Sequence, residues 1–182
     1  MGSDGVVFDA GPLNLVDRVT LERQFDRLLA ANGPALTRLA ASYTNTAGDR
    51  DDLLQEIALA IWQALPRFRG ESSERTFLFR IAHNRAISYL ARVRSQPPSV
   101  EEWEVHDPSP NPELGLAREQ AAARLRAAVH RLPVAWRQVV TLTLEGLGYG
   151  EIAEVLGISE SNVGARLSRA RQMLREALEN KK

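Results

Sequence analysis

The sequence of 182 residues contains no cysteine. This absence excludes disulfides, thiolate zinc sites, iron–sulfur clusters and cysteine nucleophiles. No apolar run approaches the roughly 20 residues that are needed to cross a bilayer, and the N-terminus lacks the basic start of a secretory signal peptide. We therefore expect a cytoplasmic protein of one or two small domains, because this length rules out a large barrel enzyme.

Groups that would carry catalysis are also scarce. The three histidines are widely separated and predict no imidazole cluster. Ser72 and Ser73 have no general-base residue nearby in the sequence. The segment with a glycine on either side of Leu147 is too short for a phosphate-binding loop and lacks the lysine of that motif. We expect a protein that is not an enzyme and that needs no cofactor.

The formal net charge is zero, but the charges are unevenly distributed. Residues 1–94 hold 12 basic and 11 acidic side chains, and residues 118–182 hold 11 basic and seven acidic ones. Residues 95–117 hold five acidic side chains and no basic one. A phosphate backbone responds to a local patch, so the neutral total does not exclude nucleic-acid binding.

The acidic middle segment also interrupts secondary structure. Its five prolines are Pro97, Pro98, Pro108, Pro110 and Pro112. Prolines combined with unpaired acids predict an extended linker over residues 95–116, joining two domains. Trp103 is unusual in such a spacer, since a large aromatic side chain normally docks on a surface.

The rest of the sequence shows helical periodicity, so we predict an all-α fold of two small helical domains. Thr20 is expected to cap the first helix, and Asn32-Gly33-Pro34 to end it and begin another. The expected helices cover residues 20–31, 34 onwards, 49–65, 76–94, 114–131 and 133–145, followed by two shorter ones flanking Gly157. The expected boundaries are a flexible N-terminal extension at 1–19, a first domain at 20–94, the linker at 95–116, a second domain at 117–178 and a tail at 179–182.

Residues 149–174 have the pattern of a helix-turn-helix. Ala153 supplies a small residue at the helix crossing and Gly157 a left-handed turn, while Ser159 suits an N-cap. The second helix is expected to bury a stripe of Val163, Leu167, Ala170 and Leu174. An ordinary helical hairpin is the alternative.

The exposed side of that second helix is the candidate surface for duplex DNA. Its residues are Ser161, Asn162, Ala165, Arg166, Ser168, Arg169 and Arg171. The arginines suit phosphate contacts, whereas the small side chains offer few donors that reach base edges. We therefore predict modest direct readout of sequence.

Acidic residues crowd the start of the expected helix 49–65. They are Asp49, Asp51, Asp52 and Glu56, beside Leu53 and Gln55. Favourable charge at a helix N-terminus is enough to explain two of the acids. A divalent-metal cluster of Asp51, Asp52 and Glu56 is another alternative, although nothing else in the sequence suggests a metal.

The segment 67–94 holds seven arginines against two acids. Its helix is expected to bury Leu78, Phe79, Ala82, Ala86, Tyr89, Leu90 and Val93. Another face carries Arg80, Asn84, Ser88 and Arg92, with Arg85 alongside. Ile81 also falls on this polar face, outside the expected core positions, so we expect it to be exposed. This cationic face, together with Phe68 and Phe77 beside the preceding loop, suits an unstacked nucleotide strand; a solvated arginine face is the alternative.

The two halves together resemble a known family. Residues 49–94, beginning DRDDLLQE, resemble region 2 of an extracytoplasmic-function (ECF) sigma factor of bacterial RNA polymerase, and residues 130–178 resemble region 4. The resemblance covers about residues 20–94 and 117–178. It implies a subunit that binds core polymerase, directs it to promoters and helps to melt them. It also implies an anti-sigma factor as a partner and no membrane insertion.

The resemblance further implies roles for individual residues. The polymerase clamp helices would bind Asp49, Asp51, Asp52, Leu53, Gln55 and Glu56. The downstream (−10) promoter element, including a flipped base, would contact Phe68, Arg69, Phe77, Arg80, Ile81, Asn84, Arg85 and Arg92. The exposed face of the helix-turn-helix would bind the upstream (−35) element, region 4 would dock on the polymerase flap, and the acidic linker would run toward the active centre.

Gly164 and Ala165 depart from the family pattern, which has a basic or polar residue followed by serine. We therefore predict weak or unusual specificity for the upstream element. Two other interpretations stay open at this point. A free-standing helix-turn-helix regulator would bind duplex DNA tightly without polymerase, and a metal-dependent enzyme would bind a metal ion at the acidic cluster.

Overall fold

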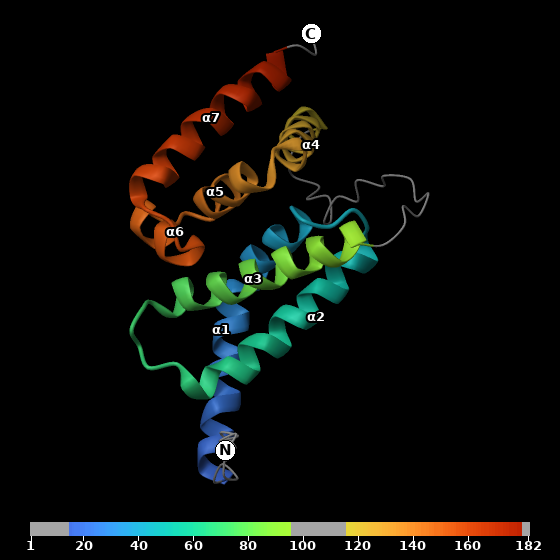
Figure 1. Ribbon diagram of the computed structural model, residues 1–182. Helices are drawn as coiled ribbons and strands as arrows, with labels where there is room; N and C mark the ends of the chain where they lie inside the picture. Colours follow the sequence, from blue (N-terminus) through green and yellow to red (C-terminus); the bar gives the residue numbers. More distant parts are fainter. Residues whose placement is uncertain (1–14, 96–115, 180–182) are drawn as a thin grey trace, which may run out of the picture.

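The computed structural model describes residues 15–95 and 116–179 (Figure 1). Within these ranges every regular element is a helix, which confirms the predicted fold class. The elements are α1 Leu15–Ala41, α2 Ala47–Ala64, the 3₁₀ turn η1 Leu65–Arg67, α3 Glu74–Ser95, α4 Leu116–Arg131, α5 Val134–Leu144, α6 Tyr149–Leu156 and α7 Glu160–Glu179. None of these helices is long and apolar enough to cross a membrane. The predictions for the linker prolines and Trp103 lie outside the described residues.

Helix α1 runs unbroken through Pro34, so the predicted break at residues 32–34 is wrong. An interior proline costs about 3 kcal/mol or more, but Leu28 before it and Leu39 after it are both buried in the same core. That shared burial holds the helix together across the proline. Thr20 likewise lies inside α1 and does not cap it, because the helix begins at Leu15.

Helix α2 begins close to its predicted start. The side chain of Thr46 caps it by accepting a hydrogen bond from the backbone N–H of Asp49 at 3.1 Å. The helix ends where Pro66 forces the tighter η1 turn. Its inner face buries Leu53 and Ile57, which pack against α1 and α3.

Helix α3 is covered on more sides than its sequence predicts. The expected core positions Leu78 and Phe79 are fully buried, but Val93 is 40% exposed near the end of the helix. Thr76, Phe77 and His83, which the helical wheel leaves outside the core, are buried as well. The reason is that α3 packs against α1 and α2 on one side and against α6 on another.

In the second domain, α5 and α7 form the main helix pair. Val163, Leu167 and Ala170 of α7 are buried, as the predicted stripe requires, and Leu174 is half-buried at its end. The sequence predicted a short helix after Gly157, but α7 is 20 residues long. No glycine or proline follows Gly164 in the sequence to end it.

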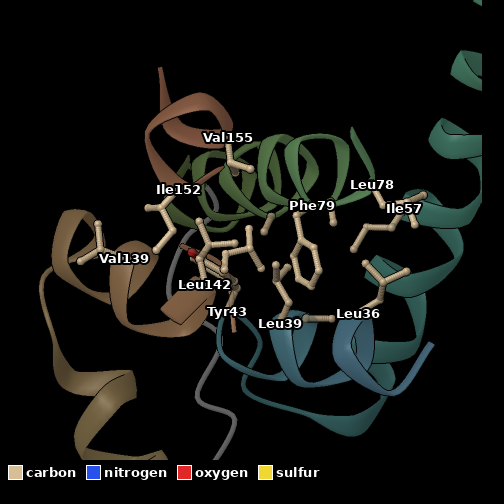
Figure 2. Close-up of a cluster of buried hydrophobic side chains, with 14 of the residues drawn as sticks. Leu36, Leu39, Tyr43, Ile57, Leu78, Phe79, Val139, Leu142, Ile152 and Val155 are labelled. Atoms are coloured by element: carbon tan, nitrogen blue, oxygen red, sulfur yellow. The ribbon is translucent and has the colours of Figure 1, made fainter. Parts of the chain in front are cut away.

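The two domains also pack directly against each other. Helix α3 lies beside α6 (Figure 1), and one cluster of buried hydrophobic side chains runs through both domains. Figure 2 shows Leu39, Tyr43 and Phe79 of the first domain close to Leu142 and Ile152 of the second. The sequence predicted two domains on a tether and gave no sign of this contact.

Candidate nucleic-acid and polymerase interfaces

A basic hollow lies where α2 turns into α3. It has a volume of about 490 Å³ and is lined by Pro66, Arg67, Phe68, Arg69, Glu71, Ser72, Phe77 and Arg80. The rings of Phe68 and Phe77 pack together at its wall, with centroids 4.6 Å apart and planes tilted by 37°. Phe68 is half-buried whereas Phe77 is only 8% exposed, so Phe77 supports the ring of Phe68 from behind.

The loop that forms this hollow is fixed at both ends. Pro66 and η1 lead out of α2, and Gly70 takes a left-handed conformation with φ of 73°. At the other end, the hydroxyl of Ser73 accepts a hydrogen bond from the N–H of Thr76 at 3.0 Å. The carboxylate of Glu74 then ties the start of α3 to Arg27 of α1 at 2.6 Å. The hollow therefore has a defined shape on a rigid base.

The predicted residues for the downstream element do not all meet at the hollow. Phe68, Arg69, Phe77 and Arg80 line it. Asn84, Arg85 and Arg92 are exposed farther along α3. The sequence predicted an exposed Ile81, and this prediction is wrong. The side chain is half-buried against the hydrophobic core, because the helices packed around α3 cover part of the helix face on which Ile81 lies.

Two of the arginines on α3 already have acidic partners. Arg92 donates to Glu56 of α2 at 2.6 Å, with both side chains partly exposed. Arg80 lies 3.7 Å from Glu154 of α6. Both pairs are exposed enough for solvent to weaken them, and such pairs contribute about 0–1 kcal/mol each. Neither pair prevents a phosphate group from competing for the arginine.

The acidic residues of α2 divide into structural and exposed groups. Asp49 accepts a hydrogen bond from the Thr46 hydroxyl at 2.8 Å, so it belongs to the helix cap. Burial, and then the nearby Asp49 carboxylate, raises the pKa of Tyr89 to about 12. Leu53 is fully buried and belongs to the core, so it offers no surface to a partner.

The other acidic positions form an outward face. Asp51, Asp52 and Gln55 are exposed and Glu56 is half-exposed. Leu59, one turn farther along, is 57% exposed, so an apolar side chain lies beside these acidic residues. No group of three or more residues able to hold a metal ion occurs in the described part of the chain.

The helix-turn-helix has the predicted geometry. Gly157 takes the left-handed conformation, with φ of 65°, between α6 and α7. The Ser159 hydroxyl accepts a hydrogen bond from the N–H of Asn162 at 3.3 Å, which makes it the N-cap. Arg166 donates to the Asn162 side chain at 2.9 Å, so the two are held together on the helix surface. The other predicted contact residues, Ser161, Ala165, Ser168, Arg169 and Arg171, are exposed.

Gly164 of α7 lies beside an aromatic side chain of α6. A β-carbon at this position would lie 3.6 Å from Cε2 of Tyr149, which is 42% exposed at the start of α6. This is an ordinary van der Waals distance, so an alanine side chain would fit beside the ring.

Comparison with known proteins now decides the family. Residues 28–96 match the family Sigma-70 region 2, and residues 122–174 match the family Sigma-70, region 4. The chain belongs to the sigma-70 family. The first domain is therefore region 2 and the second is region 4, and such proteins are non-enzymatic subunits that direct RNA polymerase to promoters.

Relatives of similar length place the chain in the ECF group. It is 31% identical to the ECF RNA polymerase sigma-E factor of Escherichia coli over 185 aligned residues, covering 92% of this chain and 94% of that protein. It is 30% identical to RNA polymerase sigma-H factor of Pseudomonas aeruginosa over 178, covering 91% and 92%. It is 33% identical to the sigma factor CnrH of Cupriavidus metallidurans over 168, covering 87% and 88%.

Two solved structures share the fold. CnrH in complex with the cytosolic domain of CnrY has a TM-score of 0.67 and 29% identity, covering 88% of this chain and 91% of that one. The sigma factor RpoE in complex with the anti-sigma factor NepR from Bartonella quintana has a TM-score of 0.71 and 23% identity, covering 88% and 99%. This second likeness concerns the fold alone.

Three surface residues of this sigma factor were missed by sequence reasoning. Arg67 lines the hollow of region 2, and its position beside Phe68 and Arg69 in the arginine-rich loop was the available signal. Leu59 and Tyr149 are apolar or aromatic residues within helical periodicity, where they look like core positions. Only their exposure in the fold identifies them as surface features.

Proposed function

We propose that the hollow of region 2 captures an unpaired nucleotide of the downstream promoter element. The observation that carries this proposal is the juxtaposition of the Phe68 ring with Arg67, Arg69 and Arg80 around one cavity. An aromatic wall stacks on a base of any kind, and the guanidinium groups neutralise the adjoining phosphates. Asn84, Arg85 and Arg92 extend the same cationic side along α3 and would follow the strand away from the cavity.

The outward face of α2 would bind the core polymerase. Asp51, Asp52 and Glu56 offer negative charge around the exposed Leu59. Charged side chains beside an exposed apolar one suit a protein partner that carries basic and apolar groups. The buried Leu53 would act only by holding this face in place.

Region 4 would dock on the upstream element through the exposed face of α7. Arg166, Arg169 and Arg171 would contact phosphates, which fixes position without reading sequence. Ser161, Ala165 and Ser168 are too short to reach base edges with bidentate contacts. The upstream contact would therefore contribute affinity more than specificity.

An anti-sigma factor is proposed as a regulatory partner, and the cytoplasm as the location. The support for the partner comes from two sigma factors of the same fold that were solved as complexes, one of them with a named anti-sigma factor. The cytoplasm is proposed because the promoters at which the protein would act lie on the bacterial chromosome. The proposed boundaries of the two domains are 20–94 and 117–178, and the family matches over residues 28–96 and 122–174 support them.

Binding to the cognate bacterial core RNA polymerase tests these roles. The double variant Asp51→Arg/Asp52→Arg should lose most of its affinity, because two repulsive charges replace two attractive ones. The matched control is Asp17→Arg/Asp26→Arg, which makes the same charge change at exposed positions of α1 and should bind as the wild type does. Equal loss in both variants, or tight binding of duplex DNA by the wild type without polymerase, would contradict the assignment.

A further inference from the structure

A second hollow, the α4–α5 groove, lies between the turn that joins α1 to α2 and the helices α4 and α5. Its volume is about 390 Å³, within the roughly 300–1,000 Å³ of ligand pockets, so it has room for a large side chain. Its exposed surface is largely apolar, with contributions from Leu125, Val129 and Leu144. Leu144 is 63% exposed and Leu125 is 37% exposed, so both present apolar surface to solvent. The small side chains of Ala41 and Ala122 leave space between these walls.

The charged side chains at this groove are mainly basic. Arg38, Arg50 and Arg126 all line it. The acidic side chain in the lining, Glu145, is only 5% exposed and is neutralised by Arg38 at 2.6 Å. Arg50 also contacts Asp51, which lies outside the lining, and Arg38 keeps 58% of its side chain exposed. The group that best complements this groove is therefore apolar, with acidic neighbours.

The chain between α3 and α4 is attached close to the groove at both of its ends. Tyr89, which lies six residues and about 9 Å before the end of α3, is beside the Asp49 carboxylate in the first turn of α2. Ala47, the first residue of that helix, lines the groove. Ala122, another lining residue, comes six residues and about 9 Å after the start of α4. Residues 96–115 therefore leave the described part of the chain near one wall of the groove and rejoin it at another.

That segment contains a side chain of the required kind. Residues 101–105 read EEWEV, so the indole of Trp103 has three acidic neighbours in sequence. Trp103 follows Ser95 by eight residues, which span up to about 29 Å of extended chain. The aromatic residue of the N-terminal segment, Phe8, does not reach the groove. Its seven residues before Leu15 span up to about 25 Å, whereas Arg38 lies about 35 Å from Leu15 along α1.

We infer that the α4–α5 groove is a docking site for the chain's own linker: it binds the indole of Trp103 and sets the neighbouring acids against its arginines. The acids are Glu101, Glu102 and Glu104. Because the linker is tethered at both ends, its effective concentration at the groove is roughly millimolar, so a contact that would be weak between separate molecules is enough. The docking needs neither DNA nor polymerase, and it is therefore independent of the proposed function.

Quenching of a fluorophore at the groove tests the docking in the free, full-length chain. Asn45 lines the groove and is exposed, and because the sequence has no cysteine, Asn45→Cys would carry a single bimane label. Tryptophan quenches bimane on contact. We expect the labelled protein to be dimmer, by about twofold or more, than the same labelled protein with Trp103→Phe, since the other two tryptophans contribute equally to both samples. A label at Asp17→Cys, about 30 Å from Arg38 along α1, should be insensitive to Trp103→Phe.

Substitutions in the groove separate docking from accidental proximity. Leu144→Glu places a negative charge in the apolar wall and should restore at least half of the lost brightness at Asn45→Cys. Leu178→Glu makes the same change at another exposed leucine, on α7, and should restore none. Equal brightness with and without Trp103→Phe would overturn the inference, and so would quenching that Leu144→Glu leaves unchanged. Quenching that disappears on dilution would overturn it too, because Trp103 would then belong to a second copy of the chain.

Discussion

The imidazole of His83 packs edge-on against the ring of Tyr43, with centroids 6.2 Å apart and planes at 75°. Both side chains are buried at the centre of the molecule, and Arg137 of region 4 contacts the same tyrosine. This small cluster therefore joins α1, α3 and α5. Its one titratable group in the neutral range is His83, which makes the stability of the centre depend on pH.

Acidification should destabilise the protein before most carboxylates titrate. Burial lowers the pKa of His83 to about 4, whereas an unfolded histidine titrates near 6.5. Between these values the unfolded chain binds more protons than the folded one, so stability is lost as the pH falls from about 6.5 toward 4, by about 2 kcal/mol between pH 7 and pH 5. Burial also lowers the pKa of His130, which adds a change in the same direction.

Urea unfolding at several pH values between 5 and 7 measures this effect. The variant His83→Leu should show a clearly smaller decrease in unfolding free energy over that range, whatever its stability at pH 7. An identical pH dependence in the variant and the wild type would mean that His83 is not buried in its neutral form.

The aromatic wall of the hollow should determine the affinity for single-stranded promoter DNA. Replacing Phe68 with alanine removes a stacking surface, and stacking contributes about 1–3 kcal/mol per base, which is roughly a five- to 160-fold change in affinity. Fluorescence anisotropy of the holoenzyme with a labelled single strand, taken from a promoter at which this holoenzyme initiates, gives the affinity. Phe68→Tyr keeps the ring and should bind within about twofold of the wild type. If alanine and tyrosine bind alike, the ring does not stack on a base.

Two glycines of the helix-turn-helix should respond to the same substitution with opposite signs. Gly164 lies inside α7, and a β-carbon there would make ordinary contact with Tyr149, so Gly164→Ala should stabilise the fold by about 0.5–1 kcal/mol. Gly157 has φ of 65°, so Gly157→Ala should destabilise it by about 1–2 kcal/mol. Thermal unfolding of the two variants beside the wild type decides this, and a change of the same sign in both would be inconsistent with the turn geometry.

The upstream promoter element should contribute little specificity. A bidentate side-chain contact to a base discriminates by about 1–3 kcal/mol, and the short side chains of Ser161, Ala165 and Ser168 cannot make one. Scrambling the upstream element should therefore reduce holoenzyme initiation by less than about tenfold. Arg166→Ala/Arg169→Ala should weaken initiation from matched and scrambled templates alike, because phosphate contacts carry no sequence information. Strong discrimination between the two templates by the wild type would refute the prediction.

Local patterns in the sequence predicted the features that depend on local physics. The turn at Gly157, the cap at Ser159 and the buried stripe beginning at Val163 follow from backbone conformation and helical periodicity, and all three are present. The start of α2 near Asp49 was predicted to within a few residues for the same reason. The motifs of both regions were recognisable because each lies within one continuous segment.

Features that depend on distant parts of the chain could not be predicted in this way. Pro34 is a strong local signal for a break in the helix, but the burial of side chains before and after it in α1 outweighs that signal. Ile81 and His83 are covered because other helices pack against α3 from several directions, which a helical wheel cannot represent. The hollow of region 2 needs the three-dimensional course of the loop, and the contact between regions 2 and 4 joins residues about a hundred positions apart.

The ion pair of Arg38 and Glu145, which joins α1 to the end of α5 at 2.6 Å, has a consequence for the interchange of domains among sigma factors. Its members lie 107 positions apart, one in each region. A chimera that joins region 2 of this protein to region 4 of a relative would keep this ion pair only if the relative also has an acid at the position of Glu145. The two regions are thus matched to each other by residues outside their proposed DNA-binding surfaces, and a poorly matched chimera would lose this part of the contact between them.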